Sequence, residues 1–260
     1  TSIAISSDDS ALANDDGTTN NNVGIGLNAG ANITTGADNL AIGKSAMGTG
    51  VTTGADNIAI GQEAGNDLTT GQYNVFIGAN AGDEVTTASN TIAIGRRSIG
   101  QGVTTGADNV AIGQNTGHEI TSGQNNLIAG SYAANSLQTG SENVLLGAFS
   151  GGYLVTGTGN TFTGYFAGYG VSGTADNNTM VGKSSGVGKT SGSNNTLIGY
   201  RAIASAPTVS NEITLGDTNV TSFRIPGIQS GATSGDVLTY DGSKLALATP
   251  AAGGVGEYIN

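Results

Sequence analysis

A five-residue unit, Asn-Ile-Ala-Ile-Gly at residues 57–61, returns along most of the chain at an almost constant spacing. Close copies stand at residues 39–43 and 109–113. Successive copies are 17 or 18 residues apart, counted between their final glycines. Twelve copies on so regular a spacing predict one short structural unit stacked many times. The marker glycines that end the copies are Gly26, Gly43, Gly61, Gly78, Gly95, Gly113, Gly130, Gly147, Gly164, Gly182, Gly199 and Gly216.

The hydrophobic pattern inside each unit has the period of a β-strand. Apolar residues alternate along the unit, β-branched residues are common, and no helical stripe appears. Two short strands and two turns in about 17 residues predict a flat coil of a parallel β-solenoid, a β-roll. The expected fold over residues 21–216 is therefore all-β, with about 12 coils in a rod of roughly 55–60 Å.

The two faces of the repeated strand are both apolar. The residues three and one before each marker glycine, such as Ile58 and Ile60, share one face and are expected to fill the coil. The residue between them is then expected to point outward. An outward apolar residue needs a cover, so we expect an obligate homo-oligomer, with three chains around an axis. The predicted trimer-interface residues are Ala59, Phe76, Ile128, Leu145, Phe162, Met180 and Leu197.

The remainder of each unit reads as turns around a second strand. A small residue three positions after the marker glycine, such as Ala64, predicts a tight corner. A second apolar residue follows and is expected to head another strand, as at residues 51–53. The unit closes on Gly-Ala-Asp-Asn at residues 54–57 or a relative of it, which is turn chemistry because Gly and Asn tolerate positive φ.

Both ends of the chain leave the pattern. Residues 1–20 are polar, and residues 2–6 resemble a worn copy of the unit, which predicts an N-terminal cap coil or, alternatively, a flexible leader. Residues 217–260 predict a final strand at 219–226, then a β-hairpin turning at Asp241-Gly242, and a Gly/Ala-rich linker from residue 250. The chain begins without Met, so we expect a processed product or part of a longer protein.

Composition narrows the classes of partner. The formal net charge of −11 disfavours nucleic acid and anionic membranes, both of which recruit basic side chains. The sequence contains no run of ~18 apolar residues, so it predicts no membrane-inserted helix. The absence of Cys excludes disulfides and thiolate metal sites within this sequence.

Few residues suggest catalysis or metal binding. His118 is the only histidine and sits at a repeat turn, where no Ser/His/Asp set assembles around it. The Gly-Val-Gly-Lys-Thr run at residues 186–190 lacks the earlier glycine of a phosphate loop. We therefore expect no cofactor and no metal. Four acidic turn residues leave two interpretations open, a Ca²⁺ ladder or capping of Asx turns: Asp38, Asp56, Asp108 and Asp176.

Aromatic residues gather in the later repeats. Tyr132, Phe149 and Phe166 each stand two residues after a marker glycine in successive units, which predicts a vertical aromatic ladder. Tyr165 and Tyr200 are expected to lie beside it. Two hypotheses follow. The five residues form a strip on which the sugar rings of a cell-surface glycan stack, or they pack against a neighbouring chain or loop.

The repeats resemble two families of fibrous proteins. The Asn-Val-Ala-Ile-Gly strand at 109–113, with its alternating turns, resembles the β-roll heads of trimeric autotransporter adhesins. The ~17-residue unit with turns such as Thr-Thr-Gly-Ala-Asp-Asn at 52–57 is more similar to repeats of bacteriophage tail-fibre proteins. Residues 211–224 resemble the segment that ends such repeats before an endosialidase-type intramolecular chaperone, and residues 235–244 resemble a module common in phage fibres.

The resemblance implies a homotrimeric, non-enzymatic tail fibre of a virion. Such a fibre binds a host cell-surface glycan or protein receptor and contacts other particle proteins. The alternative is the head of a bacterial adhesin at the cell surface. A third class, a depolymerase on a β-helical spike, needs a pair of carboxylates in a groove, and the repeat shows no departure that supplies one.

Overall fold

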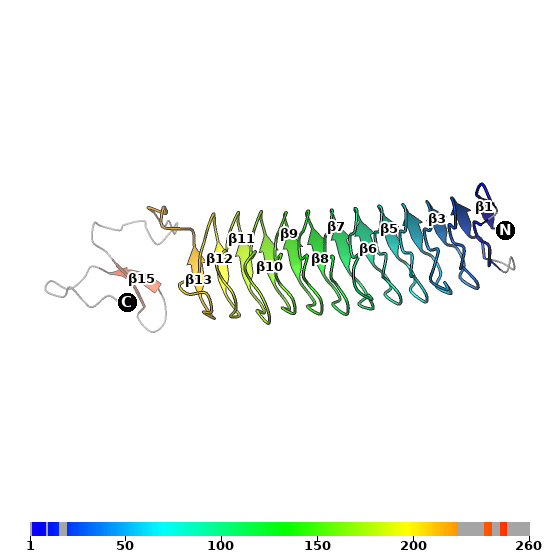
Figure 1. Ribbon diagram of the computed structural model, residues 1–260. Coiled ribbons are helices and arrows are strands. Elements are labelled where there is room, and N and C mark those ends of the chain that lie inside the picture. Colours follow the sequence, from blue (N-terminus) through cyan, green and yellow to red (C-terminus); the bar gives the residue numbers. More distant parts are fainter. Residues whose placement is uncertain (1, 9, 16–19, 223–236, 241–244, 249–260) are drawn as a thin grey trace. The chain divides into compact units, whose positions relative to one another are not determined.

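The computed structural model describes residues 2–8, 10–15, 20–222, 237–240 and 245–248. It divides into two compact units, residues 1–217 and 218–260. The first is an all-β parallel solenoid of about 12 turns with a ~17-residue repeat (Figure 1). No helix occurs among the described residues. Its thirteen strands are β1 (Ile3–Ile5), β2 (Val23–Ile25), β3 (Leu40–Ile42), β4 (Ile58–Ile60), β5 (Val75–Ile77), β6 (Ile92–Ile94), β7 (Val110–Ile112), β8 (Leu127–Ala129), β9 (Val144–Leu146), β10 (Thr161–Thr163), β11 (Thr179–Val181), β12 (Thr196–Ile198) and β13 (Ile213–Leu215).

Equivalent residues of successive units lie directly beside one another. The strands form one sheet in sequential order, and Ile58 of β4 pairs with Val75 of β5. The marker glycines follow each strand. Gly61 has a φ of 134°, and a Cβ there would lie 2.6 Å from the carbonyl oxygen of Gly78. Only glycine suits both the dihedral angle and this stacking distance, which explains why the unit ends on it.

The unit near the N-terminus takes the same conformation. Strand β1 pairs in parallel with β2, and Ile3 lies opposite Val23. Residues 3–5 therefore add one coil before the first marker glycine.

The prediction of a second strand in each coil is wrong. Outside the named strands, the described residues form only two isolated bridges, Ile33 with Thr52 and Val85 with Thr104. The remainder of the coil turns through left-handed backbone positions, such as Glu63 at a φ of 56°. Extended backbone cannot continue through these positions, so each coil carries one three-residue strand.

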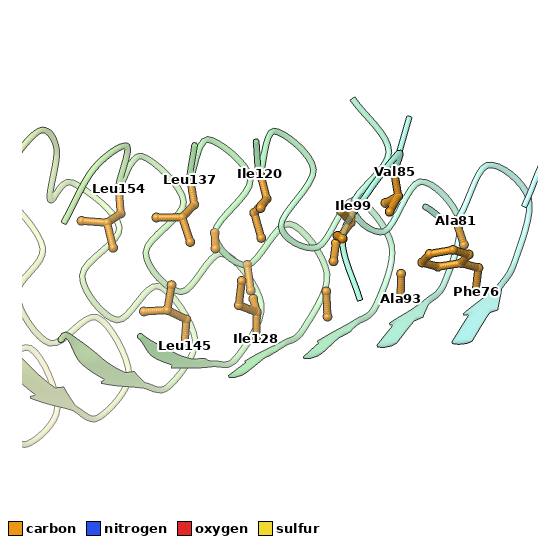
Figure 2. Packing of buried hydrophobic residues seen from close by; sticks show 14 of the residues in the cluster. Phe76, Ala81, Val85, Ala93, Ile99, Ile120, Ile128, Leu137, Leu145 and Leu154 are labelled. Carbon is orange, nitrogen blue, oxygen red and sulfur yellow. The ribbon is translucent and has the colours of Figure 1, made fainter. Parts of the chain in front are cut away.

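The predicted orientation of that strand is also wrong. The middle residue points into the coil, and its two neighbours point out (Figure 2). Ile58 is 37% exposed, whereas Ala59 beside it is fully buried. The residues predicted to meet a partner chain are therefore core residues of their own chain, each with no exposed surface: Ala59, Phe76, Ile128, Leu145, Phe162, Met180 and Leu197.

Space inside the coil decides this orientation. Figure 2 shows middle strand residues rising toward an apolar residue from the opposite side of the coil, as Leu145 does toward Leu137 and Ile128 toward Ile120. Large middle residues are matched by glycines: a Cβ on Gly82 would lie 2.4 Å from the Phe76 ring. A narrow coil thus admits one strand side chain, and each large one that it buries contributes about 1.5–3 kcal/mol.

A ladder of buried asparagines also fixes the orientation. Asn143 Oδ1 accepts hydrogen bonds from the backbone N–H of Asn160 at 2.9 Å and from its Nδ2 at 3.1 Å. Asn143 Nδ2 donates to the Gly157 carbonyl at 2.9 Å. The ladder stands four residues before each marker glycine, on the same strand face as the middle residue. Thr91 interrupts it, and its asparagines are Asn22, Asn39, Asn57, Asn74, Asn109, Asn126, Asn143, Asn160, Asn178 and Asn195.

The second unit contains two described strands. β14 (Val237–Tyr240) and β15 (Leu245–Ala248) pair in antiparallel fashion, with Val237 opposite Ala248. The predicted turn at Asp241-Gly242 and the predicted linker lie outside the described residues. Residues 219–222 of the predicted final strand are not in strand conformation, and the rest of it also lies outside the described residues.

Candidate functional site

The outward residues of β2 to β9 form a continuous apolar strip, which we call the outer face. It consists of the residues three and one before each marker glycine. Ile112 is 43% exposed and Leu127 is 42% exposed, and most other members are half-buried. On β10 both of these positions are hydroxylated, Thr161 and Thr163, whereas β11 and β12 each carry one threonine and one apolar residue, and β13 carries two apolar residues. The residues of the outer face are Val23, Ile25, Leu40, Ile42, Ile58, Ile60, Val75, Ile77, Ile92, Ile94, Val110, Ile112, Leu127, Ala129, Val144 and Leu146.

The predicted aromatic ladder is present. The rings of Tyr132 and Phe149 stack with centroids 5.4 Å apart and planes 5° apart. Phe149 and Phe166 stack at 4.9 Å and 6°. Tyr165 packs edge-on against Phe166 at 4.4 Å. Four of the five predicted residues therefore form one cluster.

Tyr200 is not part of that cluster. It is 55% exposed, and the guanidinium of Arg201 lies 6.0 Å from its ring centroid. Two other tyrosines join instead. Tyr169 packs edge-on against Phe166 at 4.5 Å and lies 4.8 Å from Tyr153. Sequence reasoning missed this pair because they stand five and six residues after their marker glycines, at different places in the repeat. Their only signal was the density of tyrosine in this part of the chain.

The backbone does not favour aromatic residues at the ladder position. Tyr132, Phe149 and Phe166 have φ values of 58°, 59° and 58°, in the left-handed region. Other coils place polar residues there, such as Asn28 and Asn80. Left-handed backbone costs a side chain with a Cβ about 1–2 kcal/mol, and Asn bears it best. The three aromatic rings therefore occupy this position in spite of the backbone, and their mutual stacking offsets part of the cost.

A hollow of about 120 Å³ opens beside the aromatic cluster. Tyr169 donates a hydrogen bond to the Tyr153 hydroxyl at 3.2 Å across one side of it. Among the described residues, the side chains of Asn135 and Ser136 have no hydrogen-bond partner, and both are half-buried. No charged residue lines the hollow, whose lining consists of Tyr132, Asn135, Ser136, Phe149, Gly152, Tyr153 and Tyr169.

A second hollow, of about 290 Å³, is polar and charged. It gathers Asp83, Glu84, Arg97 and the lone His118. Burial raises the pKa of the Asp83 carboxyl, with smaller contributions from neighbouring carboxylates, although a hydrogen bond from Asn80 opposes the rise. Burial lowers the pKa of His118.

The carboxylates of this second hollow accept hydrogen bonds from the turns around it. Asp83 accepts a hydrogen bond from Asn80 Nδ2 at 3.1 Å, and Glu84 accepts one from the Gly102 backbone N–H at 2.8 Å. The Asp83 bond closes a turn within one coil, and the Glu84 bond joins two successive coils. The sequence did not predict this gathering, because the residues come from three repeats and only Asp83 and His118 share a repeat position, two units apart.

The acidic turn residues do not assemble a metal site. Asp38, Asp56 and Asp108 share a left-handed turn position, whereas Asp176 lies one residue earlier in its unit and accepts the Thr158 N–H at 2.8 Å. No group of three or more His, Asp or Glu residues suited to a metal occurs within the described part of the chain.

Lys189, from the run that echoes a phosphate loop, is a buried residue. It lies in the column that Leu154 and Val171 occupy in earlier coils, and its Nζ donates to the Val209 carbonyl at 2.6 Å. Desolvation lowers the pKa of its amine. The side chain therefore occupies a core position, and its amine bonds the chain's own backbone.

Within the described residues, no helix is long and apolar enough to cross a membrane. The chain matches no protein-family model, and comparisons with curated proteins and with solved structures likewise returned no match.

Proposed function

We propose that this chain is a non-enzymatic, self-associating element of a fibre, in which three copies pack their outer faces around a common axis. The observation that supports the proposal most strongly is the outer face itself. Two apolar side chains stand on each of eight successive strands, from β2 to β9, and they are only half-covered by their own chain. A strand face that remains exposed to solvent normally carries polar residues.

A second copy of the same chain fits this face better than an unrelated partner. The outer face is nearly flat, uncharged and repeats at the strand spacing, about 34 Å from β2 to β9. It offers sixteen outward residues, 15 of them Val, Ile or Leu, which is within the ~20–30 residues a side of a standard interface when the flanking turns are counted. Three such faces around an axis cover one another and leave none open at the end of the assembly.

The fibre is proposed to belong to a bacteriophage virion, where it serves as shaft and contacts the host. The Thr-Thr-Gly-Ala-Asp-Asn turns and the residue 211–224 segment support this setting by their resemblance to tail fibres. The second candidate is the head of a bacterial surface adhesin, which the Asn-Val-Ala-Ile-Gly strands favour. Both settings use the same self-associating solenoid.

The mass in solution tests the proposal. Light scattering after size exclusion is expected to give three times the chain mass of 25.5 kDa. Ile94→Asp, in the middle of the outer face, is expected to give a folded single chain, because a buried unpaired charge prevents the contact. Thr163→Asp is the matched control, at the same repeat position on β10 beyond the apolar strip. A wild-type protein that stays at the single-chain mass would overturn the proposal.

A further inference from the structure

We infer that the hollow beside the aromatic cluster is a binding site for a neutral sugar ring. This inference rests on the proposed fibre for its biological setting, but every residue that lines the hollow comes from one chain. It names the ligand class, the position of the site and the residues that bind.

The fold of the repeat does not depend on the aromatic residues of the cluster. Coils with Asn28 or Asn80 at the ladder position have the same strand, marker glycine and core as the coils with Phe149 or Phe166. The aromatic rings also occupy a strained backbone position. Folding of the repeat therefore does not require them, and a role at the surface accounts for their presence.

The rings of the cluster differ in how open they are to a ligand. Phe149 has Tyr132 on one face and Phe166 on the other, so the ladder presents edges and acts as a support. Tyr153 stands beside it and is 51% exposed. The hydrogen bond from Tyr169 to Tyr153 and the edge contacts of Tyr169 hold this pair in place.

Polar groups also line the hollow. Asn135 offers an amide that both donates and accepts, and Ser136 offers a hydroxyl, and neither is satisfied by the protein. An apolar ring beside a few unpaired hydrogen-bonding groups is typical of a small-molecule site. A pyranose has this combination, since its C–H face packs on a tyrosine ring while its hydroxyls bond to an amide.

Charge selects among sugars and other ligands. The lining holds no charged side chain, and the chain carries a net charge of −11. Sialylated or sulfated glycans and nucleic acids would meet repulsion with no basic partner in the hollow. Neutral hexoses and N-acetylhexosamines remain as the class that fits. A proline-rich peptide, which also uses tyrosine grooves, is the competing ligand that the experiment separates.

The test uses the wild-type chain on an array of neutral and acidic oligosaccharides, with proline-rich peptides as further probes. We expect binding to neutral oligosaccharides, at least tenfold weaker for Tyr153→Ala and for Asn135→Ala. Tyr200→Ala is the matched control, because that tyrosine is equally exposed but outside the cluster. It is expected to bind as the wild type does.

Several results would overturn the inference: no saccharide binding by the wild type, preference for acidic glycans or peptides, or equal loss with Tyr200→Ala. The mass in solution and the melting temperature of each variant are also measured. If Tyr153→Ala breaks the assembly, the aromatic residues serve packing between chains and the inference fails. If Ile94→Asp leaves the assembly intact while Tyr153→Ala abolishes sugar binding, the proposed assembly face fails and the sugar site stands.

Discussion

The asparagine ladder gives a prediction whose size follows from its hydrogen bonds. Asn143→Ala removes the acceptor of the Asn160 backbone N–H and the donor to the Gly157 carbonyl, both of which are buried. An unsatisfied buried polar group costs about 1–3 kcal/mol, so the variant is expected to lose about 2–4 kcal/mol in unfolding free energy. For a chain of this size that corresponds to a melting temperature lower by roughly 4–16 °C.

The chain also offers the reverse experiment. Thr91 lies in the ladder but supplies no side-chain carbonyl to the next coil. Asn109 Nδ2 there keeps the usual bond to the Gly123 carbonyl and bonds the Gly106 carbonyl in place of the missing acceptor. Thr91→Asn restores the missing acceptor for the Asn109 backbone N–H. We expect a gain of about 1 kcal/mol, because one hydrogen bond is added without a change of fold.

The assay is urea unfolding followed by circular dichroism, at one protein concentration so that self-association affects all variants equally. Gln124→Ala is the control, since this exposed side chain lies next to the ladder coil of Asn126 without contributing to it. If Asn143→Ala unfolds at the same urea concentration as Gln124→Ala, the ladder does not stabilise the solenoid. If Thr91→Asn destabilises, the ladder's geometry is wrong at that coil.

Two further predictions concern the core and the charged turns. Leu145→Ala is expected to lose about 3–5 kcal/mol of unfolding free energy, because it opens a cavity in the core. Leu146→Ala, on the outer face, is expected to lose less than about 1.5 kcal/mol in the dissociated chain. Equal losses in thermal unfolding would contradict the observed strand orientation. The raised pKa of Asp83 means that its ionised form costs stability as pH rises through that pKa. Asp83→Asn is therefore expected to raise the melting temperature slightly at pH 7 and to leave it unchanged in acid, where the Asp83 carboxyl is protonated in the folded and the unfolded chain alike. Melts that show no such pH dependence would refute this.

Much of the fold follows from the sequence because its causes are local and repeated. The spacing of glycines such as Gly61 and Gly78 fixes the length of each coil and the in-register pairing of β4 with β5. The alternation of Ile58, Ala59 and Ile60 fixes the strand. These features need no knowledge of which segments meet across the coil.

The orientation of the strand required such knowledge. With two apolar faces, hydrophobicity does not distinguish inside from outside, and the larger Ile58 and Ile60 pointed to the wrong answer. The available signal was Asn57, because a polar residue at a fixed place in the ladder must be buried to bond successive coils, and Ala59 shares its face. Likewise, only part of the aromatic hollow could be predicted from the sequence. The ladder followed from spacing, whereas Tyr153 and Tyr169 join it through the path of irregular turns.

The corrected orientation makes the argument for assembly stronger. An outward column of middle residues such as Phe76 and Leu145 would vary in size from Ala to Phe, and such a column would make an uneven interface. With those residues inside, glycines at the turns absorb the variation, and the outer face presents Val, Ile and Leu at nearly every position from β2 to β9. Threonine occupies both outward positions of β10, and the aromatic cluster lies in the turns that follow β8, β9 and β10. The strands and the turns of the same chain thus carry the two proposed roles, self-association through the outer face and ligand binding beside the aromatic cluster.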